Sequence, residues 1–448
     1  MGFRRLRMVA VPVHDAAPRW PGLAALVIHP VVVAMLGCGH GDQGRMDDSI
    51  EPAEFSRHDS AGIVISSSSG VAARSPLAWE VEVEPELVLG AGNSRGEYLH
   101  RVQGVKGLPG NRVLVVDGGS QELRFYDAEG RLVKRAGGSG EGPGEFRDPV
   151  LVPLFGKDSL LLFDKMIPRF QVLAEDGAYG RGIRHVRGWP SGRVPPLGAK
   201  GDRVLFRGSG SRAHQSDRPR EGLVINDRWY FWYDPFSGDT IHLAVFQFDS
   251  YQTREVHVAV PFRALPSATV GRWGALVTDG RAPEIRVYDT EGHLVRVFRV
   301  EEARRPVTRA MLDRRFEIES AGYPPESPMS RQAYVTELYG PVPVPDSLPV
   351  FQTLMVDELG WLWAGVYDFD PARPREWVVF DEEGRAHGTV RTPPGLEVQW
   401  IGRDAILGVW KDEFGVEYVH RHRLTRAPPP RGAGEAGEDR QEGGASWD

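Results

Sequence analysis

A short strand that ends in an acidic turn recurs along this chain of 448 residues. The clearest copies are LRFYD at 123–127, IRVYD at 285–289 and WVVFD at 377–381, which are followed by AEGRL, TEGHL and EEGRA. Looser copies begin at Phe170 and Tyr230. Asp at the first turn position and Gly at the fourth suit a type I turn followed by a left-handed residue, which joins two antiparallel strands. The repeat therefore predicts a series of antiparallel sheets.

A second apolar run precedes most copies of this strand: RVLVVD from Arg112, SLLLFD from Ser159, GALVTD from Gly274 and WLWAGV from Trp361. The last unit, residues 405–424, has the same strand–turn–strand shape, and we expect it to lack the acidic turn. Six units can be delimited in this way, with starts near Val102, Pro149, Pro195, Val258, Pro349 and Leu396. Their spacing of roughly 40 to 60 residues suits propeller blades.

Sheets of four antiparallel strands cannot cover their own faces, whereas in a radial arrangement each sheet packs against the next. We therefore predict an all-β fold, a six-bladed β-propeller of four-stranded antiparallel blades over residues 62–425. Residues 62–66 are predicted to form a strand. Residues 79–89 alternate apolar and acidic side chains. We expect this N-terminal strand to pair with the last blade and close the ring, because an open ring would leave unpaired sheet edges.

The first unit resembles the NHL-type six-bladed propeller repeat. The resemblance rests on Gly104 and Val105, on residues 113–117 and 123–127, and on the GPGEF sequence at 142–146. It is good over residues 102–149, moderate in three further units, poor around 208–233 and absent from 301–346. It implies the fold and the number of blades. It implies no single activity, since such propellers serve as binding platforms, sensors, lyases or lactonases.

The beginning of the chain has the layout of a secretory signal over residues 1–38. Arginines near the start precede an apolar segment, residues 23–36, that is too short to cross a bilayer. MLGC at 35–38 resembles the bacterial lipobox, whose cysteine carries the lipid. Cys38 is the sole cysteine, so the chain forms no internal disulfide. We expect export to the cell envelope with a lipid anchor on Cys38. The alternative is an ordinary signal peptide and a periplasmic or secreted protein.

Four further segments depart from the repeat. Residues 39–61 are polar and are predicted to be a flexible tether, and residues 426–448 are predicted to be a disordered tail. An insertion at 208–227 is predicted to be a loop of the third unit. A second insertion, 301–347, is predicted to contain a short helix over 309–321.

The formal net charge of −7 argues against a nucleic-acid partner, which usually requires a basic face. We expect a monomer whose partner is a protein, a peptide or a glycan, and whose contact with a membrane is limited to the lipid.

Several charged residues are candidates for ligand binding. Asp117, Asp164 and Asp279 end the second strand of three units, so a propeller would gather them at one mouth of its channel. They either cap turns or form an acidic rim for a cation or a basic ligand. Arg124 and Arg286 occupy equivalent positions in two units, where they either bridge blades or recognise an anion.

Aromatic residues and histidines give weaker signals. Trp229 and Trp232 belong to an aromatic run that is either a buried strand or a stacking platform for a sugar or peptide. His420 and His422 would share one strand face as metal ligands. The arginines beside them disfavour a cation.

The sequence contains no recognisable catalytic set, such as a Ser-His-Asp constellation or paired carboxylates. We therefore expect a binding or scaffolding module, with its ligand site on the face that bears the strand-end loops and the insertions. The alternative is a hydrolase or lyase of the lactonase or amidating-lyase kind, with a divalent cation such as Ca or Zn in the channel.

Overall fold

The computed structural model describes residues 55–427, except for 93–97, 155–158, 185–193, 212–220, 254–256 and several positions between 322 and 338. Everything below concerns the compact unit Pro52–Asp448. The predicted signal segment with Cys38, the predicted tether up to residue 54 and the predicted tail from residue 428 lie outside the described residues. None of the helices that the structure describes has the length and hydropathy needed to span a bilayer.

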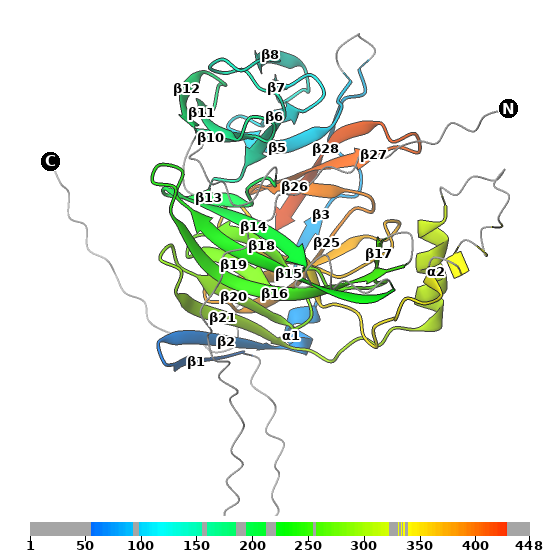
Figure 1. Cartoon of the computed structure of the whole chain (residues 1–448). Helices are drawn as coiled ribbons and strands as arrows, with labels where there is room; N and C mark the ends of the chain where they lie inside the picture. Colours follow the sequence, from blue (N-terminus) through cyan, green and yellow to red (C-terminus); the bar gives the residue numbers. More distant parts are fainter. Residues whose placement is uncertain are drawn as a thin grey trace, which may run out of the picture. The chain divides into compact units, whose positions relative to one another are not determined.

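The described residues form six β-sheets, in each of which consecutive strands pair antiparallel (Figure 1). Sheet I is β5 (Val102–Leu108), β6 (Arg112–Asp117), β7 (Glu122–Tyr126) and β8 (Leu132–Gly137). Sheet II is β9 (Pro149–Val152), β10 (Ser159–Asp164), β11 (Arg169–Ala174) and β12 (Tyr179–Arg184). Sheet III is β13 (Gly198–Lys200), β14 (Arg203–Ser211), β15 (Gly222–Tyr233), β16 (Thr240–Gln252) and β17 (His257–Ala259).

Sheet IV is β18 (Ser267–Gly271), β19 (Gly274–Thr278), β20 (Glu284–Tyr288) and β21 (Leu294–Glu301). Sheet V is β22 (Phe351–Val356), β23 (Leu362–Val366), β24 (Arg375–Phe380) and β25 (Ala386–Thr392). Sheet VI is β26 (Glu397–Ile401), β27 (Ala405–Lys411) and β28 (Glu417–Arg426). The chain is therefore all-β and built mainly of antiparallel sheets of four strands, as the repeat predicted.

The acidic turn has the predicted geometry. In the turn after β7, Asp127 Oδ1 accepts hydrogen bonds from the backbone N–H groups of Glu129 and Arg131, and Gly130 has a φ of 81°. The turns that begin at Asp289 and Asp381 repeat these two bonds. The prediction that the last unit lacks an acidic turn is wrong. Asp412 caps the turn between β27 and β28 in the same way, with Gly415 at a φ of 77°.

Six clusters of buried apolar side chains each lie between two sheets. Between sheets I and II, for example, Leu114 and Val116 pack with Leu160 and Leu162. Corresponding clusters join sheets II and III, III and IV, IV and V, and V and VI. The sixth cluster joins the last sheet to the first, through residues of β27 and β28 and of β6. Each sheet therefore buries both of its faces against other sheets.

Residues 55–89 form a strap that joins three sheets. β1 (Phe55–Ser60) and β2 (Ile63–Ser69) form a hairpin, and β2 adds in parallel to β21 of sheet IV, at the edge seen in Figure 1. After the short helix α1 (Gly70–Arg74), Pro76 bridges to Thr389 of sheet V. β3 (Trp79–Val81) and β4 (Leu87–Leu89) then pair with β28 of sheet VI. The predicted pairing of the early strand with the last sheet is therefore present.

The strap also shows where the predicted boundaries are wrong. β1 lies inside the segment predicted to be a tether, because five of its six residues are polar and exposed. Its place depends on pairing with β2 rather than on burial.

The third unit differs from its prediction as well. β14 runs to Ser211 and β15 begins at Gly222, so strands extend from both sides into the predicted loop at 208–227. β17 pairs with β16, so the fourth unit starts at Ser267 instead of near Val258. The second insertion contains α2 (Arg309–Glu319), which confirms the predicted helix. Thr308 caps its N-terminus. β28 continues to Arg426, the first residue of the predicted tail.

Candidate functional site: a cavity among the first strands

A cavity of about 910 Å³ lies among the first strands of the sheets. Its walls include residues of β5, β9, β18, β22 and β26, and Leu197 just before β13. Five of the sheets, and the residue that precedes the first strand of sheet III, thus line one space. The lining includes the turn between β5 and β6 and the start of β10. The cavity therefore lies toward the end at which the first strand of each sheet turns into the second, which we call the first-turn end.

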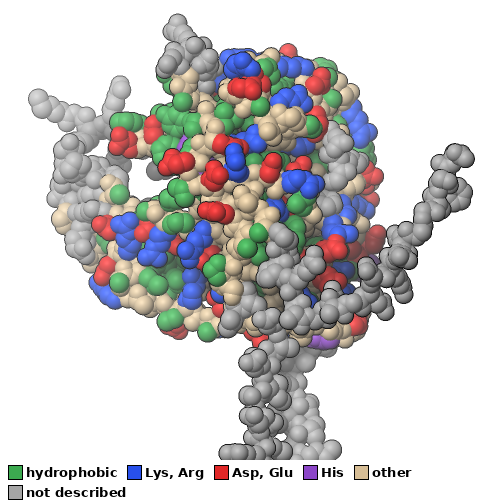
Figure 2. All heavy atoms as spheres, turned by 180° about the vertical axis from the view of Figure 1, so that it is seen from behind, with side chains coloured by type: hydrophobic (Ala, Val, Ile, Leu, Met, Phe, Trp, Pro, Cys, Tyr) green, Lys and Arg blue, Asp and Glu red, His purple; other side chains and the backbone are tan. Residues whose placement is uncertain are grey.

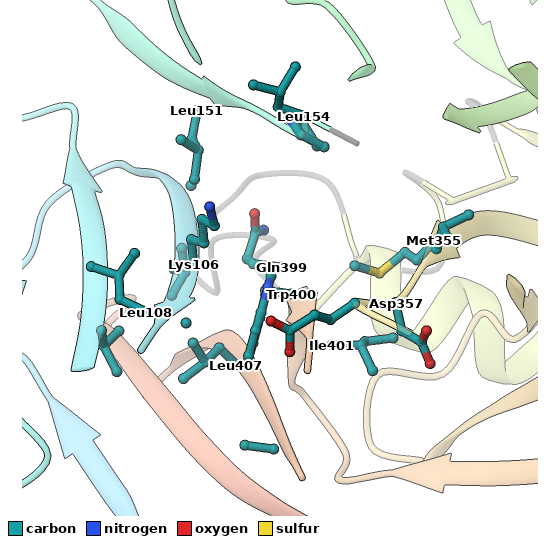
Figure 3. Close-up of a pocket in the computed structure, with 18 of the residues that line it drawn as sticks. Lys106, Leu108, Leu151, Leu154, Met355, Asp357, Gln399, Trp400, Ile401 and Leu407 are labelled. Atoms are coloured by element: carbon teal, nitrogen blue, oxygen red, sulfur yellow. The ribbon is translucent and has the colours of Figure 1, made fainter. Parts of the chain in front are cut away.

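The walls combine apolar and polar side chains. Leu151 and Leu154 stand across from Trp400, and Met355 and Leu108 flank the space (Figure 3). Apolar side chains such as these favour a ligand with an apolar body.

Glycines allow this close packing of the first strands. A Cβ atom on Gly107 would lie 2.3 Å from the Trp400 ring, so the indole rests on bare backbone of β5. Gly104 has a φ of 155°, and a Cβ there would lie 2.4 Å from the Cβ of Leu151.

Lys106 of β5 and Gln399 of β26 bring polar groups to the cavity (Figure 3). Lys106 Nζ lies 3.4 Å from Glu175 Oε1, and the side chains of both residues are 25% exposed. Lys106 therefore keeps part of its donor capacity for a ligand, because an ammonium carries three N–H donors. Gln399 adds an amide that can donate or accept.

Asp357 borders the cavity, but its carboxylate is already satisfied. Its Oδ1 accepts hydrogen bonds from the backbone N–H groups of Leu359 and Trp361. Its Oδ2 accepts bonds of 2.9 Å from Trp363 Nε1 and 2.8 Å from Arg426 Nη2. The side chain of Asp357 is fully buried. It is placed as part of the wall, not as an acid or base for a substrate.

The acidic residues singled out from the sequence lie at the other end of the sheets. Asp117 and Asp164 end their second strands, opposite the first residues of β5 and β9. Asp164 accepts hydrogen bonds from four backbone N–H groups, those of Arg147, Asp148, Met166 and Ile167. Asp117 caps the turn that follows it through Gly119 and Ser120. Asp279, which is half-buried, caps its turn through Arg281 and Ala282. Their contacts match turn capping.

The paired arginines and the tryptophans also have structural contacts. Arg124 is buried, and its Nη2 lies 3.0 Å from Asp117 Oδ2 within sheet I. Arg286 donates to Glu284 at 2.9 Å within sheet IV and lies over the Phe246 ring of sheet III. Trp232 is fully buried and donates to the Asp289 carbonyl of sheet IV at 2.8 Å. Trp229 is half-buried over Gly208. The structure brings Asp117 and Arg124 together in sheet I, and places Asp164 in sheet II, the two tryptophans in sheet III, and Asp279 and Arg286 in the region of sheet IV.

The two histidines of β28 lie with their ring centroids 5.7 Å apart. Burial lowers the pKa of His420 to about 4, and the neighbouring His422 adds to the effect. His422 Nδ1 lies 2.9 Å from the Glu82 carbonyl oxygen. Among the described residues, the one group of three potential metal ligands is Asp289, Glu291 and His293, in the turn after β20. That turn lies outside the cavity lining.

Acidic and basic side chains are interspersed on the face shown in Figure 2.

Sequence reasoning did not identify Lys106, Gln399 or Trp400. Lys106 is a single charge in an otherwise apolar strand, and Gln399 and Trp400 lie between the apolar Val398 and Ile401. Only the pairing of each first strand within its sheet determines which of these side chains faces the cavity. The one signal in the sequence for this site was the isolated charge of Lys106 within residues 102–108.

No family model matches the chain, and no curated protein matches it. Solved structures do show similarity. A member of the duf4221 family from Bacteroides vulgatus is 10% identical, with a TM-score of 0.43 over 78% of this chain and 99% of that one. An inactive virginiamycin B lyase from Staphylococcus aureus, solved with quinupristin, is 8% identical, with a TM-score of 0.33 over 78% and 100%. The calcium-binding protein regucalcin from Agrobacterium tumefaciens is 9% identical, with a TM-score of 0.30 over 80% and 97%.

Proposed function

We propose that this chain is an exported, closed six-bladed β-propeller that binds a ligand in the cavity without converting it. The observation that carries the proposal is a cavity among the first strands whose walls include leucine, methionine and tryptophan side chains, with its buried acid already hydrogen-bonded. The apolar clusters between consecutive sheets support the closed ring, and the cluster between sheets VI and I is the closing contact.

The lining favours an amphipathic ligand, such as a hydrophobic segment of a peptide or a partner protein. Leucine, methionine and tryptophan side chains would cover the apolar body, and Lys106 and Gln399 would bind a carbonyl or carboxylate group. Convergent polar groups in small number orient a ligand, whereas catalysis requires a positioned acid, base or nucleophile.

The second candidate is a metal-dependent hydrolase or lyase, which the position of the cavity among the first strands favours. Its donor set is weak in the part of the cavity that the structure describes, because the lining contains no histidine there. Of the four carboxylates in the lining, Glu175 is paired with Lys106 and Asp357 with Arg426, while Glu358 and Asp404 are exposed. Metal analysis of tag-free protein separates the candidates, because stoichiometric Ca or Zn that is lost together with activity would favour the enzyme.

The binding proposal can be tested with a library of leucine-rich peptides. Peptides that stay with the purified protein through size exclusion would be identified by mass spectrometry. We expect retained peptides to be recovered unchanged. The variants K106M and Q399L should reduce retention, while E291Q, in an exposed turn outside the lining, should leave it unchanged. Equal retention by all variants, or recovery of cleaved peptides, would contradict the proposal.

We further propose that Cys38 carries a lipid that tethers the monomer to a membrane of the cell envelope, and that its partner is a protein, peptide or glycan. The lipobox-like MLGC sequence supports this assignment. Metabolic labelling with a palmitate analogue should mark the wild-type protein but not C38S, which should leave the membrane fraction. Labelling of C38S would contradict it.

A further inference from the structure

Three half-buried arginines lie on one side of sheet III, away from the cavity lining. They are Arg207 of β14, Arg228 of β15 and Arg263, in the segment between β17 and β18. Arg207 pairs directly with Tyr230, and Arg228 lies two residues before Tyr230. Side chains two apart on a strand, and those directly opposite on its partner, share a sheet face. Arg207, Arg228 and Tyr230 therefore project from the same face.

That face is directed toward sheet IV. Tyr230 and Phe246 belong to the apolar cluster that packs sheet III against Val270, Ala275 and Val277. In β14, Arg207 follows Leu205 of this cluster by two positions, and in β15, Arg228 precedes Tyr230 by two. They thus occupy the boundary between two sheets, where apolar packing ends.

The heads of Arg228 and Arg263 are held close together. The guanidinium carbon of Arg228 lies 4.9 Å from the centroid of the Phe248 ring, and that of Arg263 lies 5.7 Å from the same centroid. Arg228 Nη1 donates to the Pro266 carbonyl at 3.2 Å, and Arg263 Nη1 donates to the Asp249 carbonyl at 3.4 Å. Each head is anchored by a neutral carbonyl oxygen and retains further N–H donors.

No carboxylate of the described residues forms an ion pair with Arg207, Arg228 or Arg263. The nearby Asp249 carboxylate is 3.0 Å from Arg281. Two polar atoms of the cluster are buried without a hydrogen-bond partner of ordinary geometry among the described residues, Arg228 Nε and the Tyr230 hydroxyl. A buried polar atom without a hydrogen bond destabilises the fold, and a ligand that forms the bond removes this penalty.

The electrostatics agree with this geometry. Burial lowers the pKa of Arg228, and the charges of Arg207 and Arg263 lower it further. Burial raises the pKa of Tyr230 although Arg228 and Arg207 oppose the shift, so its hydroxyl stays protonated and can donate. A cluster of like charges with spare donors gains stability when an anion enters it.

We propose that Arg207, Arg228, Arg263 and Tyr230 form a binding site for one oxyanion group of a small ligand. A carboxylate, sulfate or phosphate group would accept N–H bonds from the guanidinium groups and an O–H bond from Tyr230. This site is separate from the cavity, because none of the four residues lines it. The anion-binding test and the peptide-binding test of the cavity therefore give independent results.

The test is calorimetric titration of the purified full chain with phosphate, sulfate and citrate, each in low salt. We expect at least one of the three anions to bind, with an affinity that falls as sodium chloride is added. R207M should weaken binding by about tenfold or more, and Y230F by a few fold, because each removes a donor to the anion.

The control is R131M, which removes an arginine that is 74% exposed in the turn of sheet I. It should bind the anion as the wild type does. R207M without anion should be at least as stable as the wild type, because it relieves like-charge repulsion and breaks no hydrogen bond among the residues that the structure describes. The proposal is overturned if none of the three anions binds, or if R207M and R131M bind equally well.

Discussion

The ion pair between Asp357 and Arg426 should be one of the most sensitive points of the fold. It joins the turn after β22 in sheet V to the end of β28 in sheet VI. Arg426 also donates to the Gly402 carbonyl at 2.8 Å and lies 4.4 Å from the centroid of the Trp79 ring in β3. Its side chain is 12% exposed and that of Asp357 is fully buried, so solvent screens the pair little.

The variant R426M keeps most of the side-chain volume but leaves the Asp357 carboxylate without its counter-charge. Removing one partner of a buried pair costs about 3 to 5 kcal/mol. The lower end applies, because backbone and indole N–H donors still solvate the carboxylate. Lost stacking on Trp79 adds about 1 kcal/mol. We therefore expect R426M to lower the free energy of unfolding by about 4 kcal/mol.

Urea denaturation followed by tryptophan fluorescence measures this effect, with R131M as the exposed control, expected to change stability by about 0.5 kcal/mol or less. The double mutant R426M/D357N should be less destabilised than the sum of the single variants, by about 2 kcal/mol. A cost for R426M below about 1 kcal/mol, or a coupling energy near zero, would refute the reasoning.

Three further predictions concern other parts of the chain. His420 has a pKa of about 4 in the folded protein and an ordinary value of 6.5, so the unfolded chain takes up the proton first as the pH falls. The free energy of unfolding should therefore be unaffected by this group above pH 6.5 and should fall by about 1 kcal/mol as the pH is lowered toward 4. Denaturation measured across pH should show that H420Q lacks this decrease. G104A should cost about 2 kcal/mol or more, because its Cβ would collide with Leu151 at a left-handed φ, and the open turn position Gly110 gives a milder control as G110A. T308A should cost about 1 kcal/mol by removing the N-cap of α2, seen as faster hydrogen exchange in that helix alone.

Local patterns predicted most of the strands. The β-branched runs and the Asp-x-x-Gly turns specify hairpins through contacts within a few residues, so sheets I, II, IV and V follow from the sequence. β1 could not be predicted in this way, because five of its six residues are polar and exposed and its strand partner is β2.

The candidate sites depend on long-range register, which the sequence does not display. Lys106 and Gln399 meet only because the first strands of sheets I and VI face one cavity. Arg207, Arg228 and Arg263 are spread over more than fifty positions of an arginine-rich sequence, and pairing between β14 and β15 brings the first two to one face.

The strap formed by residues 55–89 sets an order of events during synthesis. Ser66 donates to the Glu383 carbonyl across 317 positions, and β3 meets β28 only after the last sheet exists. Residues 55–89 are synthesised before the six sheets. They can therefore pair fully only after β21 and β28 have been synthesised. A nascent chain of this kind exposes the edges of β21 and β28 until the strap docks on them. Removal of the strap from the folded protein would expose the edges of β21 and β28 together. During refolding of the intact chain, residues 55–89 should be the last to become resistant to protease.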